Sequence, residues 1–99
     1  MANQISYENL AVSDSAVSFT ASTVTNRAKS AIITVEGADV RWRADGTSPS
    51  ATVGSLLKDG EKLIFRGEGI IKNIEFIRDA STDAVVHGAF FSEANDVAI

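Results

Sequence analysis

Residues that could do chemistry are few in this chain, and His87 is the single histidine among its 99 residues. A Ser-His-Asp site needs an imidazole held between a carboxylate and a hydroxyl group. Serines are plentiful, but none lies in the Gly-x-Ser-x-Gly turn that exposes a nucleophile. His87 shares one face of an alternating segment with Val85 and Ala89, which favours a partly buried, hydrogen-bonded side chain over a catalytic base. We expect no enzyme and no catalytic residue.

Carboxylates, the other candidates for chemistry, gather in pairs at predicted turns: Glu36 with Asp39, Asp59 with Glu61, and Asp79 with Asp83. Turn chemistry accounts for them, because Asp side chains accept hydrogen bonds from nearby backbone amides. The 79–83 turn offers the oxygen ligands that calcium prefers, but its spacing matches no known calcium loop. We expect no metal site.

Cofactor motifs are also missing. Gly67 and Gly69 are followed neither by the third glycine of a dinucleotide fingerprint nor by the Lys-Ser/Thr of a phosphate-binding loop. This pair is typical of a bend in an edge strand. The sequence has no cysteine, which excludes disulfides and thiolate zinc sites. We expect no cofactor.

Composition predicts one globular domain over residues 1–99, with 44% hydrophobic and 22% charged residues. The net charge is −4, and the basic residues are scattered singly or in pairs. A nucleic-acid binder concentrates its cations on one patch, so we expect no nucleic acid as a partner. The N-terminus lacks a signal-peptide pattern, and no apolar run reaches the ~20 residues that span a bilayer. We expect a soluble protein, made in the cytoplasm, with no membrane partner.

Alternating apolar and polar residues predict strands, with turn signals recurring every ~8–12 residues. Residues 5–12 are either a first strand or an extended N-terminal arm within residues 1–30. Further strands are expected at 17–23, 31–36, 40–44, 62–66, 70–78 and 84–91, with a short apolar segment at 55–57 and a tail at 92–99. The turn at 36–39 predicts that 31–36 and 40–44 pair as a hairpin. The fold class is all-β, a small antiparallel β-sandwich or barrel of jelly-roll-like form, with a core in residues 31–91.

The segment 40–54 joins a strand to a closely specified loop. Trp42 falls on the face of the strand opposite to Arg41 and Arg43. In the loop, Gly46 can adopt a positive φ and Pro49 cannot donate to a sheet ladder. We expect Trp42 in the core and the two arginines on a solvated or partner-facing rim.

Several motifs together resemble a known class of proteins. They are the run Val-Arg-Trp-Arg-Ala-Asp-Gly-Thr-Ser-Pro-Ser-Ala at 40–51, Phe-Ile-Arg at 76–78, Ser-Thr-Asp at 81–83 and Phe-Phe at 90–91. In this order they resemble small virion proteins of tailed bacteriophages, over roughly residues 31–91. The resemblance implies a small β-sandwich structural component of a phage particle, without catalytic residues.

From this resemblance we expect a capsid decoration or cement protein that binds the outer shell and bridges subunits of the major capsid protein. Its partners would be the major capsid protein or other virion subunits, and copies of itself as a homo-oligomer. The expected contact residues are Ile5, Tyr7 and Leu10 in the arm, and Arg41 and Arg43 on the rim. One alternative is a tail, connector or vertex component that forms a ring or trimer. Another is a host-surface or glycan-binding module.

Overall fold

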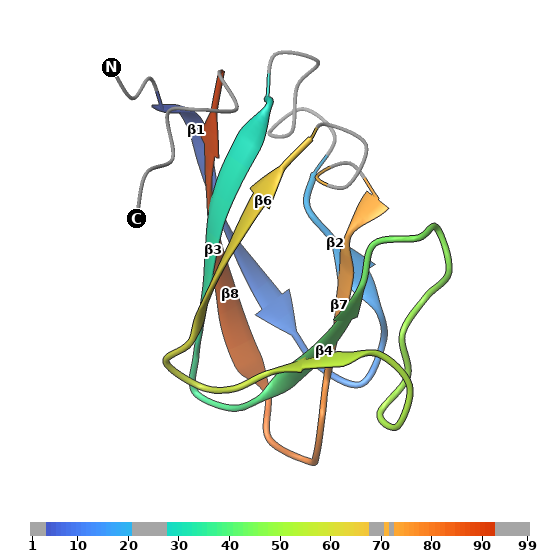
Figure 1. The fold of residues 1–99 in the computed structure, drawn as a ribbon. Coiled ribbons are helices and arrows are strands. Elements are labelled where there is room, and N and C mark those ends of the chain that lie inside the picture. The colour runs from blue at the N-terminus through green and yellow to red at the C-terminus, as the bar shows by residue number, and fades with distance from the viewer. Residues whose placement is uncertain (1–3, 21–27, 68–70, 72, 93–99) are drawn as a thin grey trace.

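The computed structural model describes residues 4–20, 28–67, 71 and 73–92. Within these residues the chain forms two antiparallel sheets of four strands each, packed face to face (Figure 1). Sheet A has the order β1 (Gln4–Val12), β8 (Ala84–Phe91), β3 (Ser30–Glu36) and β6 (Lys62–Arg66). Sheet B has the order β2 (Val17–Ser18), β7 (Glu75–Arg78), β4 (Val40–Arg43) and β5 (Ser55–Leu57). The all-β sandwich that the alternation predicts is confirmed.

The core lies between the two sheets and combines aliphatic side chains with several aromatic rings. Phe19, which follows β2, packs edge-on against Phe76 of sheet B and Phe90 of sheet A, with ring centroids 5.6 and 5.1 Å apart. Trp42 and Phe65 make a second edge-to-face contact across the sheets at 5.2 Å. Edge-to-face pairs of this kind add about 0.5–1.5 kcal/mol to the burial of the rings themselves. The expectation that Trp42 faces the core is confirmed.

The predicted hairpin of residues 31–36 and 40–44 is wrong, although both strands exist. β3 lies in sheet A between β8 and β6, whereas β4 lies in sheet B between β7 and β5. The turn between them therefore crosses from one sheet to the other. Contacts with distant segments hold it, because the Gly37 amide donates to Asp59 Oδ1 at 3.2 Å and the Asp79 amide donates to the Asp39 carbonyl at 3.1 Å.

Within the described residues, the first strand belongs to sheet A and does not form a separate arm. β1 pairs with β8 of the same chain from Gln4 to Val12, so the edge of β1 that faces β8 is hydrogen-bonded within the domain. Two other strands are shorter than predicted, because β2 covers only Val17–Ser18 and β7 begins at Glu75. The remaining parts of those predictions, at 21–23, 70 and 72, and the predicted tail at 93–99, lie outside the described residues.

Candidate functional site

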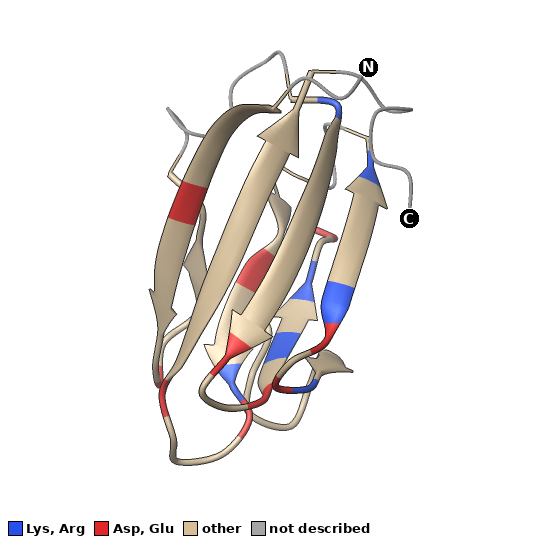
Figure 2. Ribbon diagram, turned by 90° about the vertical axis from the view of Figure 1, so that its left-hand side faces the viewer, with Lys and Arg blue, Asp and Glu red and all other residues tan. Residues whose placement is uncertain are grey.

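The outer face of sheet A carries a line of apolar side chains that we call the apolar row. It consists of Tyr7, Ala89, Ile32 and Ile64, one from each strand, and the strand register places them side by side. The Tyr7 side chain is 52% exposed, and the other three are half-buried. Figure 2 views the sandwich from this side, and β8 at the middle of the sheet bears no Lys, Arg, Asp or Glu. The row is a continuous apolar stripe on a solvent-facing sheet.

Next to the apolar row runs a polar row, one step further along the same strands: Asn9, His87, Thr34 and Lys62. His87 Nδ1 lies 2.8 Å from the Tyr7 hydroxyl oxygen and 2.5 Å from Asn9 Oδ1. His87 Nε2 lies 2.5 Å from Glu36 Oε1. Both ring nitrogens thus have partners, as expected for a hydrogen-bonded histidine. These contacts fix the orientation of the imidazole and of the Tyr7 ring, which stacks beside it at 6.2 Å.

Of the three contact residues predicted in the arm, Tyr7 alone is exposed. Ile5 and Leu10 are partly buried and pack against the core. Alternation along the paired strand sends Leu10 inward while Tyr7 and Asn9 face outward. Ile5 lies at the shift in register between Gln4 and Ser6. The prediction that Ile5 and Leu10 are available on an arm is therefore corrected. No signal in the sequence distinguished an arm from an edge strand.

The Arg41 guanidinium is bound by groups of its own chain, and its side chain is partly exposed, as that of Arg43 is. Its Nε lies 2.7 Å from Asp79 Oδ1 and 3.1 Å from the Ala51 carbonyl oxygen, and its Nη1 lies 2.9 Å from the Gly54 carbonyl oxygen. The Arg41 side chain is 26% exposed. A planar guanidinium with several donors can join three acceptors in this way. Arg41 therefore ties the loop 44–54 to the end of β7.

The loop 44–54 projects from the outer side of sheet B (Figure 1). Beyond Arg41, it is held by the Ser48 hydroxyl, which donates to Glu75 Oε1 at 2.9 Å, and by the buried ring of Pro49. The loop presents Val53, which is 50% exposed, and the following strand β5 presents Leu56, which is 40% exposed. The loop is therefore held at several points and exposes an apolar side chain near its end.

Arg43 does lie on the rim, where it forms an ion pair with Asp45. The hydrogen bond from the Arg43 guanidinium, together with that from the Thr47 amide, holds the pKa of the Asp45 carboxyl below its usual value. The same hydrogen bond raises the pKa of Arg43. Because both side chains are solvent-accessible, the pair fixes the start of the loop more than it stabilises the domain.

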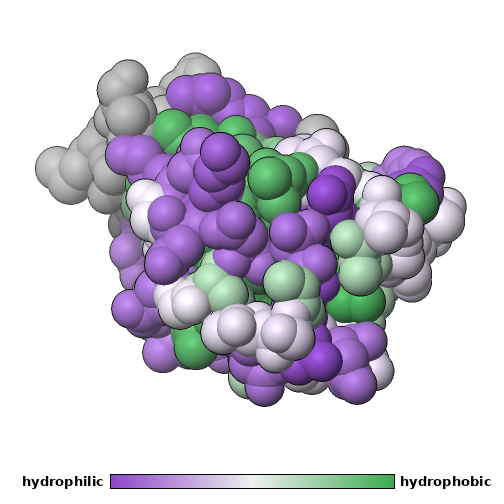
Figure 3. Space-filling model, turned by 90° about the horizontal axis from the view of Figure 1, so that it is seen from below, coloured by the Kyte–Doolittle hydropathy of each residue, from purple (hydrophilic) through white to green (hydrophobic). Residues whose placement is uncertain are grey.

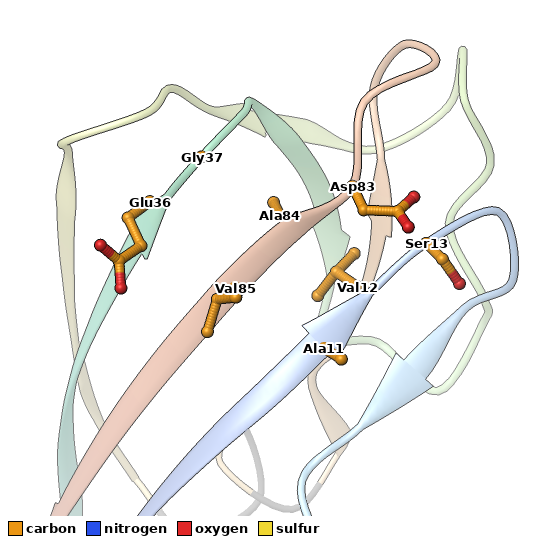
Figure 4. A pocket seen from close by; sticks show the side chains of 8 residues that line it. All are labelled: Ala11, Val12, Ser13, Glu36, Gly37, Asp83, Ala84 and Val85. Carbon is orange, nitrogen blue, oxygen red and sulfur yellow. The ribbon is translucent and has the colours of Figure 1, made fainter.

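A hollow of about 420 Å³ lies where the turns meet at the lower end of the sandwich. Glu36 and Asp83 stand on opposite sides of its floor, which includes Val12, Ala84 and Val85 (Figure 4). Seen from below, this end shows mainly hydrophilic residues around isolated apolar ones (Figure 3). Glu36 is hydrogen-bonded to His87, and Asp83 forms an ion pair with Arg78 at 2.7 Å. Both carboxylates thus have partners within the chain.

The 79–83 turn, considered above as a cation site, uses its two carboxylates for ion pairs with Arg41 and Arg78. In the described part of the chain, no group of three or more His, Cys, Asp or Glu residues is placed to hold a metal ion. Nor does that part contain a helix long and apolar enough to cross a membrane.

Comparison with known proteins brings no further assignment, since no family model, curated protein or solved structure matches the chain.

Replacing Arg41 by methionine keeps the apolar stem of the side chain and removes the guanidinium. We expect the free energy of unfolding to fall by about 1–2 kcal/mol, because the Gly54 and Ala51 carbonyl groups and the part-buried Asp79 lose a shared donor. Proteolysis within the loop 44–54 should also become faster. The matched control is Arg43→Met, which removes the solvent-accessible ion pair with Asp45 and should change the free energy of unfolding much less than Arg41→Met does. Equal effects of the two substitutions on unfolding in urea would contradict the role assigned to Arg41.

Acid should remove the contribution that the Arg43–Asp45 ion pair makes to the stability of the folded protein. The pKa of Asp45 is lowered in the folded protein from a reference value of 3.8, so its contribution is present above that reference value and is lost as pH falls through the folded pKa. We expect a small stability difference between the wild type and Asp45→Asn near neutral pH, and convergence of the two in strong acid. Urea unfolding of both proteins over a pH series measures this difference. A gap that widens in acid would contradict the sign of the shift.

Proposed function

We propose that this protein is a structural component of a phage virion, a capsid decoration or cement protein that docks on the outer shell and bridges capsid subunits. The observation that carries the proposal is the apolar row across the outer face of sheet A. Side chains such as Tyr7 and Ile64 stand there on a rigid sheet, where further burial is favourable. The order of motifs in residues 31–91, which resembles small virion proteins of tailed phages, supports the same function.

Docking would act on the particle by mass action. A protein that binds the assembled shell and not its free subunits stabilises the shell in proportion to RT ln(1 + [L]/Kd). For this chain the contact residues would be Tyr7 with its neighbours in the apolar row, or the exposed Val53 and Leu56 on the other side of the sandwich. Arg43 remains a candidate for the rim of such a contact, since part of its side chain is accessible. The partners would be the major capsid protein or other virion subunits, after synthesis in the host cytoplasm.

The alternative place in a particle is the tail, connector or vertex, where the same surfaces would join copies into a ring or trimer. The glycan-binding alternative has less support. Sugar sites use exposed aromatic rings, and all five phenylalanines are buried while the Trp42 ring packs on Phe65. Among the described residues, Tyr7 is the one aromatic side chain that is more than half exposed.

Particle composition and shell stability test the proposal. We expect hundreds of copies per virion, and we expect particles stripped of the protein to release their genome at a lower temperature than complete ones. Adding back the purified wild type should restore the higher temperature, and adding back Tyr7→Glu should restore it less well. A dozen or fewer copies would favour the connector or tail, and unchanged shell stability after stripping would remove the cementing function.

A further inference from the structure

Three side chains on the outer face of sheet A form a hydrogen-bonded series that ends at an exposed phenol. Glu36 Oε1 lies 2.5 Å from His87 Nε2, and the Tyr7 hydroxyl oxygen lies 2.8 Å from His87 Nδ1. The sequence does not reveal this series, because Tyr7 and Glu36 lie 80 and 51 residues from His87. The order carboxylate, imidazole, hydroxyl is the one by which a histidine activates a nucleophile for acyl transfer. We propose that Tyr7 is a reactive nucleophile that accepts an acyl group from an activated ester, with His87 as its base.

The partners of the two ring nitrogens determine where His87 carries its proton. An ionised carboxylate can only accept a hydrogen bond, so Nε2 carries the hydrogen that is donated to Glu36. In the neutral imidazole, Nδ1 is then an acceptor, and the Tyr7 hydroxyl is placed to donate to it. The phenol proton therefore already points at the atom that has to remove it.

Asn9 favours the charged imidazole that forms when this proton moves. Its Oδ1 lies 2.5 Å from His87 Nδ1, and a carbonyl oxygen can accept a hydrogen bond only from a protonated nitrogen. Asn9 and Glu36 together thus provide acceptors for both N–H groups of the imidazolium. Groups that bind the charge developing during a reaction, more than they bind the ground state, are the ones that accelerate it.

The surroundings leave the phenol accessible and hold the imidazole in place. Tyr7 is 52% exposed, whereas the His87 side chain is 23% exposed. Among the described residues, the titratable groups that face His87 are Tyr7 from β1 and Glu36 from β3. In the polar row, Thr34 separates His87 from Lys62 of β6. A reagent can therefore reach the phenol while the base beside it is partly shielded from water.

The expected step is a single acylation. The Tyr7 oxygen attacks the carbonyl carbon of the ester and forms a new C–O bond. The bond between that carbon and the leaving oxygen breaks, and the leaving group departs with the bonding electrons. The phenol proton passes to His87 Nδ1 and from there to the leaving group or to solvent. The product is the protein acylated at Tyr7, and the reaction needs only the purified protein, whether or not it belongs to a virion.

Acetylation of the purified protein by p-nitrophenyl acetate near neutral pH tests the proposal. Tyr7 is the single tyrosine, so mass spectrometry of its peptide after an acid quench measures the rate at this residue. We expect His87→Gln to be acetylated at Tyr7 about 100-fold more slowly, and to react only as the pH becomes alkaline, as a free phenol does.

Glu36 acts through His87 and is a positioning residue. Its side chain is 67% exposed, so its expected contribution is smaller. Glu36→Gln should slow the acetylation of Tyr7 about five- to tenfold, the difference between a charge-assisted hydrogen bond and a neutral one. The pH profile of this variant should also shift toward that of a free phenol, which a purely structural role of Glu36 would not cause.

The matched control carries the phenol at another site of nearly equal exposure. Val53 is 50% exposed and lies on the other side of the sandwich, so the variant Tyr7→Phe/Val53→Tyr has one tyrosine with no histidine beside it. We expect that tyrosine to react about 100-fold more slowly than Tyr7 of the wild type. Thermal melting shows whether each variant is folded, and His87→Asn replaces His87→Gln if the latter is not. Wild-type rates in the histidine variant or in the control, or acetylation confined to amino groups, would overturn the proposal.

Discussion

Replacing Phe76 by alanine is expected to lower the free energy of unfolding by about 3–5 kcal/mol. Phe76 is completely buried, lies between Val17 and Trp42 in the register of sheet B, and packs against the ring of Phe19. Truncation would remove the transfer free energy of the ring and leave a cavity between the sheets that the surrounding strands cannot fill. For a domain of this size the loss is a large part of the total stability of about 5–15 kcal/mol.

Urea or thermal unfolding of Phe76→Ala measures this loss. The control is Leu56→Ala on β5 in the same sheet, where the side chain points outward and is 40% exposed. That substitution should change the free energy of unfolding by less than about 0.5–1 kcal/mol. If Phe76→Ala were no more destabilising than Leu56→Ala, the core between the two sheets would not be packed as described.

Gly54→Ala should be the second strongly destabilising substitution, at about 2–4 kcal/mol. Gly54 has a φ of 137°, which L-amino acids rarely adopt, and an added Cβ would lie 3.1 Å from the Trp42 carbonyl oxygen and 3.2 Å from Pro49 Cβ. The neighbour at 3.1 Å is backbone of a paired strand and cannot move aside cheaply. The added methyl group would therefore displace the end of the loop, together with the carbonyl group that accepts from Arg41.

Gly60→Ala separates the strain of a positive φ from the steric contact of the added Cβ. Gly60 also has a positive φ, 87°, but nothing lies within 4 Å of an added Cβ. Its substitution should show the backbone strain alone, about 1–2 kcal/mol. The excess in Gly54→Ala then measures the close approach to Trp42 and Pro49. Equal losses in the two variants would mean that the loop 44–54 yields easily, contrary to the contacts seen.

Local features of the structure follow from the sequence because they depend on residues that are neighbours along the chain. Alternation predicted the last strand with its correct limits, 84–91, and placed Trp42 on the inner face of β4. The period of two is a property of any extended backbone, so it indicates which side chains share a face before any partner strand is known. The all-β class followed from the same pattern.

Strand partners and the roles of polar residues were decided only by the tertiary structure. β3 and β4 are adjacent in sequence but pair in different sheets, since pairing depends on which distant strands bury the same faces. Tyr7 lies 80 residues from His87, and Arg41 lies 38 residues from Asp79. Alternation could not show that β1 was paired, that Arg41 bound the loop 44–54 and Asp79, or that four half-exposed residues formed one row. The physical reason is that local periodicity fixes the direction of a side chain, whereas the packing of distant segments decides what it meets.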